Sequence, residues 1–225
     1  MKVSQRMTPN PVTVTPDTSH REAVSLLQEH NIRRLPVLDN RGRLVGIVTQ
    51  EDLLSHAPSK ATTLSVYEVY TLLDKLKIKQ IMSKPVFAVE ESCGLSAAAR
   101  FMVDNRVSAL PVMRGEELVG IITETDIFRS FVEVLGGRKE GLRIDLRVPN
   151  RPGVIAEITR TIAEAGGNIN SITTFDAPDG EHGELSIKEQ GADATRLAAT
   201  LDALPDVDVL SIKPHQSDRL LTFGG

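Results

Sequence analysis

The pattern of apolar and polar residues repeats within the first 135 residues of the chain. Each copy has a short apolar stretch, an amphipathic helix, two strands joined by a polar turn, and a closing helix. The first helix keeps one apolar face, from His20 to Leu27 in one copy and from Leu95 to Met102 in the other. The pattern predicts a duplicated β-α-β-β-α unit, with Val12–Val14 as the leading strand of the first copy.

The spacing of matching residues supports a duplication. Met7 and Met82 lie 75 residues apart, and Asp52 and Asp126 lie 74 apart. The missing residue falls in the polar turn between the two strands, where a hairpin tolerates a change of length. A period this long indicates a duplicated domain, because solenoid repeats are shorter.

The segment between the copies, residues 58–79, has a helical pattern of its own. Ser65 and Glu68 form a capping box, and apolar residues follow at helical spacing from Val66 to Leu76. The apolar face of this helix needs a partner. The repeat pair and a dimer interface are compatible candidates.

A different pattern begins after the glycine-rich junction of residues 136–141. Strict alternation from Leu142 to Val148 predicts a half-buried strand, and a helix with Ile155, Ile158 and Ile162 on its buried face follows. Two strands, a helix and a last strand complete a β-α-β-β-α-β order. The expected boundaries are 1–57 and 80–135 for the repeats, 58–79 for the linker, 141–213 for the last domain and 214–225 for a loose tail.

Composition places the chain among soluble globular proteins, and we expect a cytoplasmic one. It is 40% hydrophobic and 25% charged, with a net charge of −4 that gives no bulk attraction to nucleic acid or to a membrane. No apolar run approaches the ~18 residues of a membrane helix, and the N-terminal residues do not resemble a signal peptide. Cys93 is the only cysteine, which excludes an internal disulfide and a cysteine metal cluster.

Catalytic motifs are missing from the sequence. The five histidines form no helical i, i+4 pair, and there is no Gly-x-Ser-x-Gly or phosphate-loop motif. A catalytic set assembled in space stays open, but we expect neither an enzyme nor a metal site. Two Tyr, six Phe and no Trp provide few stacking platforms, so single-stranded nucleic acid is an unfavoured partner.

Each repeat carries a Gly-h-h-Thr-x-x-Asp stretch, in which h is apolar, at residues 46–52 and 120–126. The stretch ends a strand and opens a helix, where outward N–H groups favour an anion. Asp52 and Asp126 are acceptors suited to ribose hydroxyls, and Thr49 and Thr123 suit ribose or phosphate. The alternative is that these residues only cap the helices.

These motifs resemble the cystathionine-β-synthase (CBS) domain, which occurs in tandem pairs. The resemblance rests on Met-Thr-Pro and Met-Ser-Lys-Pro, on Arg-Arg-Leu-Pro-Val and Ser-Ala-Leu-Pro-Val, and on the two Gly-h-h-Thr-x-x-Asp stretches, all in register. It implies that AMP, ADP, ATP or S-adenosylmethionine binds in clefts between the copies, as a regulatory ligand and not as a catalytic cofactor.

The two clefts are expected to differ in charge. Arg33 and Arg34 offer forks for phosphate, where the second copy has Ser108 and Ala109. Apolar side chains from both copies are expected to line the adenine, namely Ile32, Leu35, Val107 and Leu110. The candidate nucleotide-binding residues are Thr8, Ile32, Arg33, Arg34, Leu35, Thr49, Asp52, Ser83, Val107, Ser108, Ala109, Leu110, Thr123 and Asp126.

Residues 141–213 resemble the ACT domain, a ferredoxin-like module that senses amino acids. The resemblance rests on Asn150-Arg151-Pro152-Gly153 after the first strand and on Gly166-Gly167-Asn168-Ile169 before the second. It implies an amino-acid site, located at a dimer interface in related domains, although many such domains only dimerise. The candidate residues are Asn150, Arg151, Gly153, Val154, Asn168 and Ile169.

A CBS pair followed by an ACT domain resembles the acetoin utilisation protein B family, whose name states no biochemical activity. The fold class expected is α/β (α+β). We expect a non-catalytic regulatory protein that binds an adenosyl ligand, acts as a homodimer or higher oligomer, and reports occupancy to a target protein. The alternative is a module that binds protein or nucleic acid without a small-molecule ligand.

Overall fold

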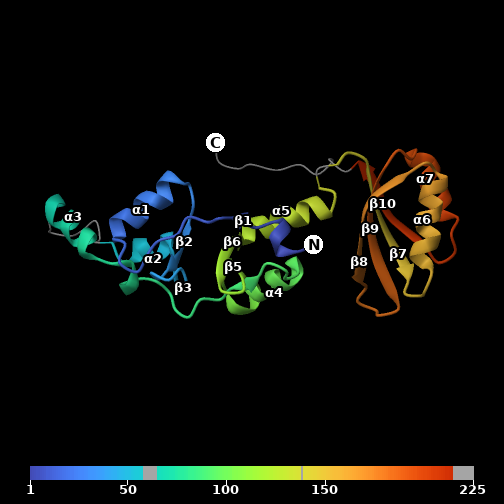
Figure 1. The fold of residues 1–225 in the computed structure, drawn as a ribbon. Coiled ribbons are helices and arrows are strands. Elements are labelled where there is room, and N and C mark those ends of the chain that lie inside the picture. The colour runs from blue at the N-terminus through green and yellow to red at the C-terminus, as the bar shows by residue number, and fades with distance from the viewer. Residues whose placement is uncertain (58–64, 138, 215–225) are drawn as a thin grey trace. The chain divides into compact units, whose positions relative to one another are not determined.

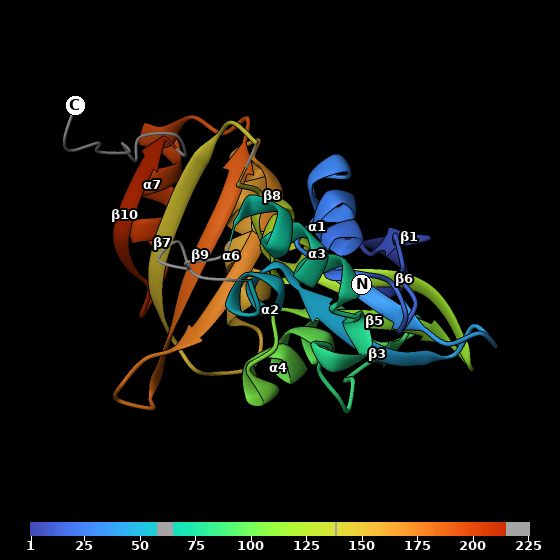
Figure 2. The same ribbon diagram turned by 90° about the vertical axis from the view of Figure 1, so that its left-hand side faces the viewer.

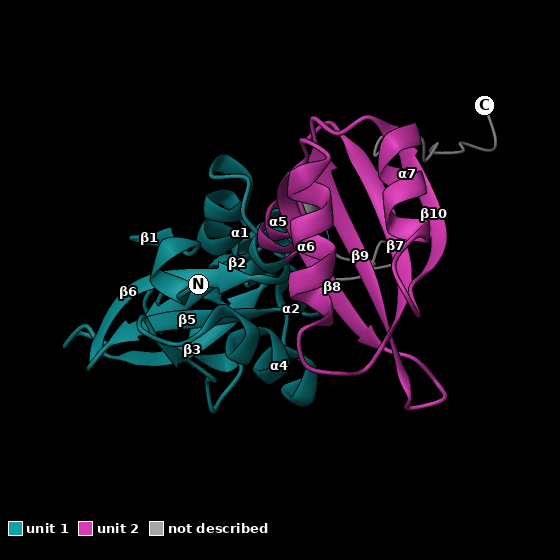
Figure 3. Ribbon diagram, turned by 90° about the vertical axis from the view of Figure 1, so that its right-hand side faces the viewer, with its two compact units in different colours: residues 1–127 teal, residues 128–225 magenta. Residues whose placement is uncertain are grey.

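The computed structural model describes residues 1–57, 65–137 and 139–214. The chain divides into two compact units, residues 1–127 and residues 128–225 (Figure 3). Each unit has its own sheets and its own buried core. No helix among the described residues is long and apolar enough to cross a membrane.

The first repeat of unit 1 is built on a two-stranded antiparallel sheet (Figure 1). Its elements are α1 (His20–Glu29), β2 (Arg34–Leu38), β3 (Leu44–Thr49) and α2 (Gln50–Ser55). The predicted leading strand at Val12–Val14 was wrong, because only Val14 pairs, in an isolated bridge to Val37. Pro11 and Pro16 flank this segment, and proline offers no N–H to a sheet.

The second repeat follows a short 3-10 helix η2 (Ile78–Gln80) and has the same α-β-β-α order, preceded by a leading strand. They are β4 (Val89–Glu90), α4 (Leu95–Asn105), β5 (Ala109–Arg114), β6 (Glu117–Thr123) and α5 (Glu124–Val134). Its four-stranded sheet has the order β1-β6-β5-β4. The α-β-β-α part of the predicted unit is therefore present twice, once on a two-stranded sheet and once on a four-stranded sheet.

The two repeats exchange their leading segments. The N-terminal strand β1 (Thr8–Pro9) pairs with β6 of the second repeat, where Thr8 lies opposite Ile121. Val3, in the 3-10 helix η1 (Val3–Gln5), is buried in the core of the second repeat. Conversely, Ile78 is buried in the core of the first repeat, and Ser83 pairs with Ile47 of β3. Neither repeat is thus complete without a segment that precedes the other.

The linker contains the predicted helix, α3 (Val66–Lys75), with its capping box. The Ser65 side chain accepts a hydrogen bond from the Glu68 N–H, and the Glu68 carboxylate accepts one from the Ser65 N–H. The helix contacts α1, and Arg21 on α1 forms an ion pair with Asp74 at 2.7 Å. Residues 58–64 of the linker lie outside the described residues, and a share of α3 in a dimer interface stays a prediction.

Unit 2 has the predicted β-α-β-β-α-β order. Its elements are β7 (Leu142–Pro149), α6 (Val154–Glu164), β8 (Asn168–Asp176), β9 (His182–Gln190), α7 (Ala194–Asp202) and β10 (Asp208–Pro214). The antiparallel sheet runs β10-β7-β9-β8, and both helices cover one of its faces (Figures 2 and 3). Between sheet and helices lies a core that includes Ile144, Leu146, Ile158, Ile187 and Leu197.

The buried face of α6 differs from the expected one by one residue. Ile155 is 40% exposed, whereas Val154 is 7% exposed and lies in the core with Ile158 and Ile162. The spacings Ile155 to Ile158 and Val154 to Ile158 both suit a helix, so the periodicity alone left both open. Val154 opens the helix next to the sheet and takes the buried place.

Candidate functional site

The two Thr/Asp pairs form matching capping boxes. In the first repeat the Asp52 Oδ2 atom accepts hydrogen bonds from the Thr49 N–H at 2.8 Å and from the Thr49 hydroxyl at 2.7 Å. In the second repeat Asp126 and Thr123 do the same at 2.9 and 2.7 Å. The capping role considered from the sequence is therefore present in both repeats.

Capping leaves part of Asp52 available for a second role. Among the described residues, its Oδ1 atom accepts no hydrogen bond, and its side chain lines a cavity of about 300 Å³. We call this the Asp52 cavity. It lies between the repeats and is lined by Arg34, Ile47, Thr49, Asp52, Ser83, Pro85, Val86, Phe87, Arg106, Val107, Ser108 and Ala109.

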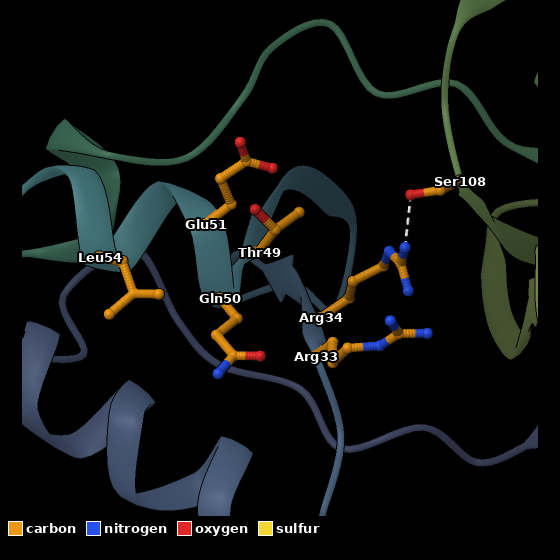
Figure 4. Close-up of a pocket in the computed structure, with 7 residues that line it drawn as sticks. All are labelled: Arg33, Arg34, Thr49, Gln50, Glu51, Leu54 and Ser108. Atoms are coloured by element: carbon orange, nitrogen blue, oxygen red, sulfur yellow. Dashed lines mark hydrogen bonds between the residues drawn. The ribbon is translucent and has the colours of Figure 1, made fainter. Parts of the chain in front are cut away.

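A second cavity of about 380 Å³ shares three lining residues with the first (Figure 4). We call it the arginine cavity, and it is lined by Arg33, Arg34, Thr49, Gln50, Glu51, Leu54 and Ser108. Because Arg34, Thr49 and Ser108 line both, the two cavities are neighbouring compartments of one cleft. A ligand longer than a nucleoside could extend from one compartment into the other.

The arginine cavity is rich in positive charge. Arg33 and Arg34 adjoin at the start of β2, and neither forms an ion pair with another described residue. The Arg34 guanidinium donates a hydrogen bond to the Ser108 hydroxyl of the second repeat (Figure 4). Burial lowers the pKa of Arg34 and the nearby Arg33 lowers it further, whereas Glu124 acts in the opposite direction. Two close cations without a paired carboxylate favour an anionic ligand.

Eight of the candidate nucleotide-binding residues line this cleft. They are Arg33, Arg34, Thr49, Asp52, Ser83, Val107, Ser108 and Ala109. Thr8, Thr123 and Asp126 line neither cavity, and Thr8 lies in β1 beside Ile121. Ile32 packs against the core of the first repeat.

Leu35 and Leu110 were expected to face the adenine, and this was wrong. Both side chains are fully buried, Leu35 in the core of the first repeat and Leu110 in the core of the second. Each strand alternates its side chains between two faces, so these leucines point away from the cleft. They support the site only by fixing the sheets on which it is built.

One apolar wall and one cation of the Asp52 cavity were not predicted from the sequence. Pro85, Val86 and Phe87 line it from the segment after Ser83, and Phe87 contacts Phe101 edge to face with centroids 5.8 Å apart. Arg106 lines it from the end of α4, in a left-handed conformation with φ 54°. The equivalent position of the first repeat, Asn31, has φ 50°. The repeat alignment could have marked both positions as a turn beside the cleft.

The candidate residues of unit 2 lie at opposite ends of its sheet. Asn150 follows Pro149, which pairs with His182, whereas Asn168 pairs with Gln190. These partners are eight residues apart along β9, or about 26 Å at a rise of about 3.3 Å per residue. One small ligand therefore cannot contact Asn150 and Asn168 of the same chain.

The backbone near Asn150 has free space beside it, unlike the backbone at Gly167 next to Asn168. Gly153 has φ 92° and is exposed, and a Cβ there would meet no atom within 4 Å. Arg151 is paired with Glu157 at 2.9 Å. The Val154 side chain is buried in the core, and the Ile169 side chain is partly buried and packs against that core.

Comparison with protein families agrees with this architecture. The CBS domain model matches residues 3–59 and 78–133, about half of the chain. The chain belongs to the CBS-domain family. The ACT domain model matches residues 143–206, in unit 2. CBS and ACT domains are regulatory modules, so this CBS pair is joined to a second regulatory domain.

Relatives of known sequence are similar over half to two thirds of the chain. The protein MJ1404 of Methanocaldococcus jannaschii is 30% identical over 150 residues, which cover 65% of this chain and 35% of that protein. Inosine-5'-monophosphate dehydrogenase of the same organism is 35% identical over 120 residues, 52% of this chain and 21% of the enzyme. The chain thus spans about a third and a fifth of the length of these two relatives.

Solved structures of CBS proteins are also similar. A Vibrio cholerae protein assigned as the acetoin utilization protein AcuB is 29% identical with a TM-score of 0.50, over 60% of this chain and 93% of that one. CBSX2 of Arabidopsis thaliana, in a complex with AMP, is 31% identical with a TM-score of 0.48, over 59% of this chain and 97% of that one.

Proposed function

We propose that the CBS pair is a regulatory sensor of adenine nucleotides and binds them in the cleft between its repeats. The observation that carries the proposal is the division of this cleft into two neighbouring compartments. The Asp52 cavity contains the Asp52 carboxylate and an apolar wall, and the arginine cavity contains Arg33 and Arg34, neither of which forms an ion pair with another described residue, with Glu51 as its one lining carboxylate. Nucleoside and phosphate need these two different environments.

The Asp52 cavity suits the nucleoside. The Oδ1 atom of Asp52 can accept hydrogen bonds from ribose hydroxyls while Oδ2 continues to cap α2. Val86, Phe87 and Val107 provide an apolar surface for the base. An adenine buried there would exchange water for apolar contact, which is favourable.

The arginine cavity suits the phosphates. A phosphate chain that leaves the ribose beside Thr49 would enter the compartment that Arg33 and Arg34 line. Guanidinium groups bind phosphate oxygens through paired, charge-assisted hydrogen bonds. ATP is therefore expected to bind this cleft more tightly than AMP does, and S-adenosylmethionine, which has a sulfonium cation and no phosphate, less tightly than ATP.

Calorimetric titration of the whole chain tests the proposal. AMP is the first ligand to try, because CBSX2 is known as an AMP complex, and ATP and S-adenosylmethionine follow. The expected result is saturable binding with ATP the tightest of the three. No heat and no thermal stabilisation with any of them would overturn it. Stabilisation by oligonucleotides alone would instead indicate a nucleic-acid-binding module.

For the ACT domain we propose an amino-acid site that two chains form together. Within one chain Asn150 and Asn168 are too far apart to share a ligand, but a two-fold axis can bring Asn150 of one chain to Asn168 of another. Occupancy would then stabilise the homodimer. This arrangement accounts for asparagines at both ends of the sheet, and its test by chain mixing is given in the Discussion.

The output of the sensor is proposed to be a change of shape that a target protein recognises. The proposed link to acetoin utilisation rests on the likeness to AcuB, which covers 93% of that chain. Deleting the gene from its host and measuring growth on acetoin tests this link. Unchanged growth and unchanged acetoin consumption would remove it without affecting the nucleotide proposal.

A further inference from the structure

Glu189 is a buried carboxylate in the core of unit 2. Its side chain on β9 has no exposed surface, which is unusual for a glutamate without a cationic partner. The Oε2 atom accepts a hydrogen bond from the Ala192 N–H at 3.2 Å. The Oε1 atom is buried and has no hydrogen-bond partner.

Two glycine turns enclose this carboxyl group. A Cβ on Gly167 would lie 2.6 Å from the Glu189 Oε2 atom, so only glycine fits there. Gly166 and Gly191 have φ 88° and 106°, and the Gly191 turn carries the Ala192 N–H that binds Oε2. Water cannot reach the carboxyl group while these turns keep their present geometry, because its exposed surface is zero.

Glu189 forms no ion pair with another described residue, so no bonded cation stabilises its ionised form. The charged groups on the segments around it are Glu164 at the end of α6, Asp193 before α7 and Arg196 on α7. Arg143 is bonded to Asp145, and Lys188 adjoins the Gly136 turn, on the sheet face opposite the helices. Burial raises the pKa of Glu189, and the Ala192 N–H offsets only part of that effect.

We propose that Glu189 is a proton switch for the turn of residues 166–168. The protonated carboxyl group fits the dry site and lets the turn pack against it. The ionised group must regain water, and the turn has to loosen to admit it. Asn168 begins β8 directly after this turn, so the position of Asn168 follows the protonation state of Glu189. The inference is independent of the nucleotide proposal.

The test is NMR spectroscopy of the full chain across pH. The Glu189 carboxyl carbon reports its own titration, and the Gly167 N–H, bonded to the Ile162 carbonyl at 2.9 Å, reports the turn through its exchange protection. Glu189→Gln keeps the shape and cannot ionise. Glu184→Gln, on the same strand but exposed, is the matched control.

The expected result is a Glu189 midpoint above the ordinary value of 4.5, with loss of Gly167 protection over the same pH range. Glu189→Gln should retain protection at all pH values, and Glu184→Gln should behave as wild type. A Glu189 midpoint at or below 4.5, or the same loss of protection in Glu189→Gln, would overturn the proposal.

Discussion

The Sδ atom of Met82 occupies the place where a Cβ of Gly46 would stand. The same relationship holds in the second repeat, where the Met7 Sδ atom occupies the Cβ position of Gly120. Each methionine belongs to the segment that precedes one repeat and packs on the sheet of the other. The glycine of each Gly-h-h-Thr-x-x-Asp stretch is thus needed for close packing between the exchanged segments.

Gly46→Ala should destabilise unit 1. The added methyl group forces Met82 to move, and overpacking of this kind costs about 1–3 kcal/mol. Ser83 follows Met82 and lines the Asp52 cavity, so nucleotide affinity should fall as well. Urea denaturation measures the first effect and calorimetry the second. Gly94→Ser is the control, because a Cβ there meets no atom within 4 Å and serine suits its helix N-cap position. Equal stability of Gly46→Ala and wild type would refute the packing argument.

Asp179 should titrate well below an ordinary aspartate. The His182 N–H at 3.0 Å and side chain at 2.9 Å, with the Glu181 N–H, outweigh a partial burial and lower the pKa of Asp179 from 3.8 to about 2. A carboxylate with a lowered pKa contributes stability that is present above pH 3.8 and is lost as the pH falls toward 2. NMR titration of its carboxyl carbon measures the midpoint. A midpoint near 3.8 would show that these hydrogen bonds do not hold the β8–β9 turn in solution.

Mixing two variant chains tests the shared amino-acid site. Asn150→Ala and Asn168→Ala should each abolish binding of the amino acid that most stabilises the wild-type chain. A mixed dimer has one intact site, so refolding the two variants together should restore about a quarter of the wild-type sites. Light scattering of each sample is the control that shows whether a dimer has formed. No recovery in mixed dimers, or a wild-type affinity in either variant, would contradict a site made by two chains.

The arginine cavity can be tested by removing its charge. Arg33→Ala with Arg34→Ala should reduce ATP affinity more than AMP affinity, because ATP places more phosphate in this compartment. The loss for two charge-assisted contacts is about 1.5–3 kcal/mol each. Arg41→Ala, in the exposed turn between β2 and β3, removes one arginine charge outside the cavity and is the control for each single variant, Arg33→Ala and Arg34→Ala; it should leave both affinities unchanged. Equal losses for AMP and ATP would place the phosphates elsewhere.

The features that could be predicted from the sequence are those that a local pattern or the internal repeat determines. The spacing of Thr49, Asp52 and their counterparts located the helix starts, and alternation along β7 located the core of unit 2. The exchange of leading segments could not be predicted this way, because Met7 and Met82 are equally compatible with packing on their own repeat. The prediction for Leu35 was wrong because its place along the strand decides which face of the sheet its side chain occupies, and apolar character alone does not show this.

In the cleft and in unit 2, the sequence could not predict which candidate residues lie close together in space. Arg33 and Ser108 belong to equivalent positions of the repeats, and only the fold shows that both reach one cleft. Asn150 and Asn168 come from the two stretches that carry the resemblance to the ACT domain, yet the pairing of the strands places them at opposite ends of the sheet. The predicted domain boundaries and the role of each candidate residue in ligand binding stay predictions.

Titration of ATP into Asp52→Ala tests the central claim most directly. If Asp52 holds the ribose, its removal should weaken binding by about 1.5–3 kcal/mol, or roughly ten- to a hundredfold. Asp126→Ala removes the same kind of cap from the other repeat, so it controls for the ~1 kcal/mol of stability that a lost cap costs. Asp52→Ala should lose affinity at the Asp52 cleft, and Asp126→Ala should keep the wild-type affinity there. Wild-type affinity and stoichiometry in Asp52→Ala would contradict it.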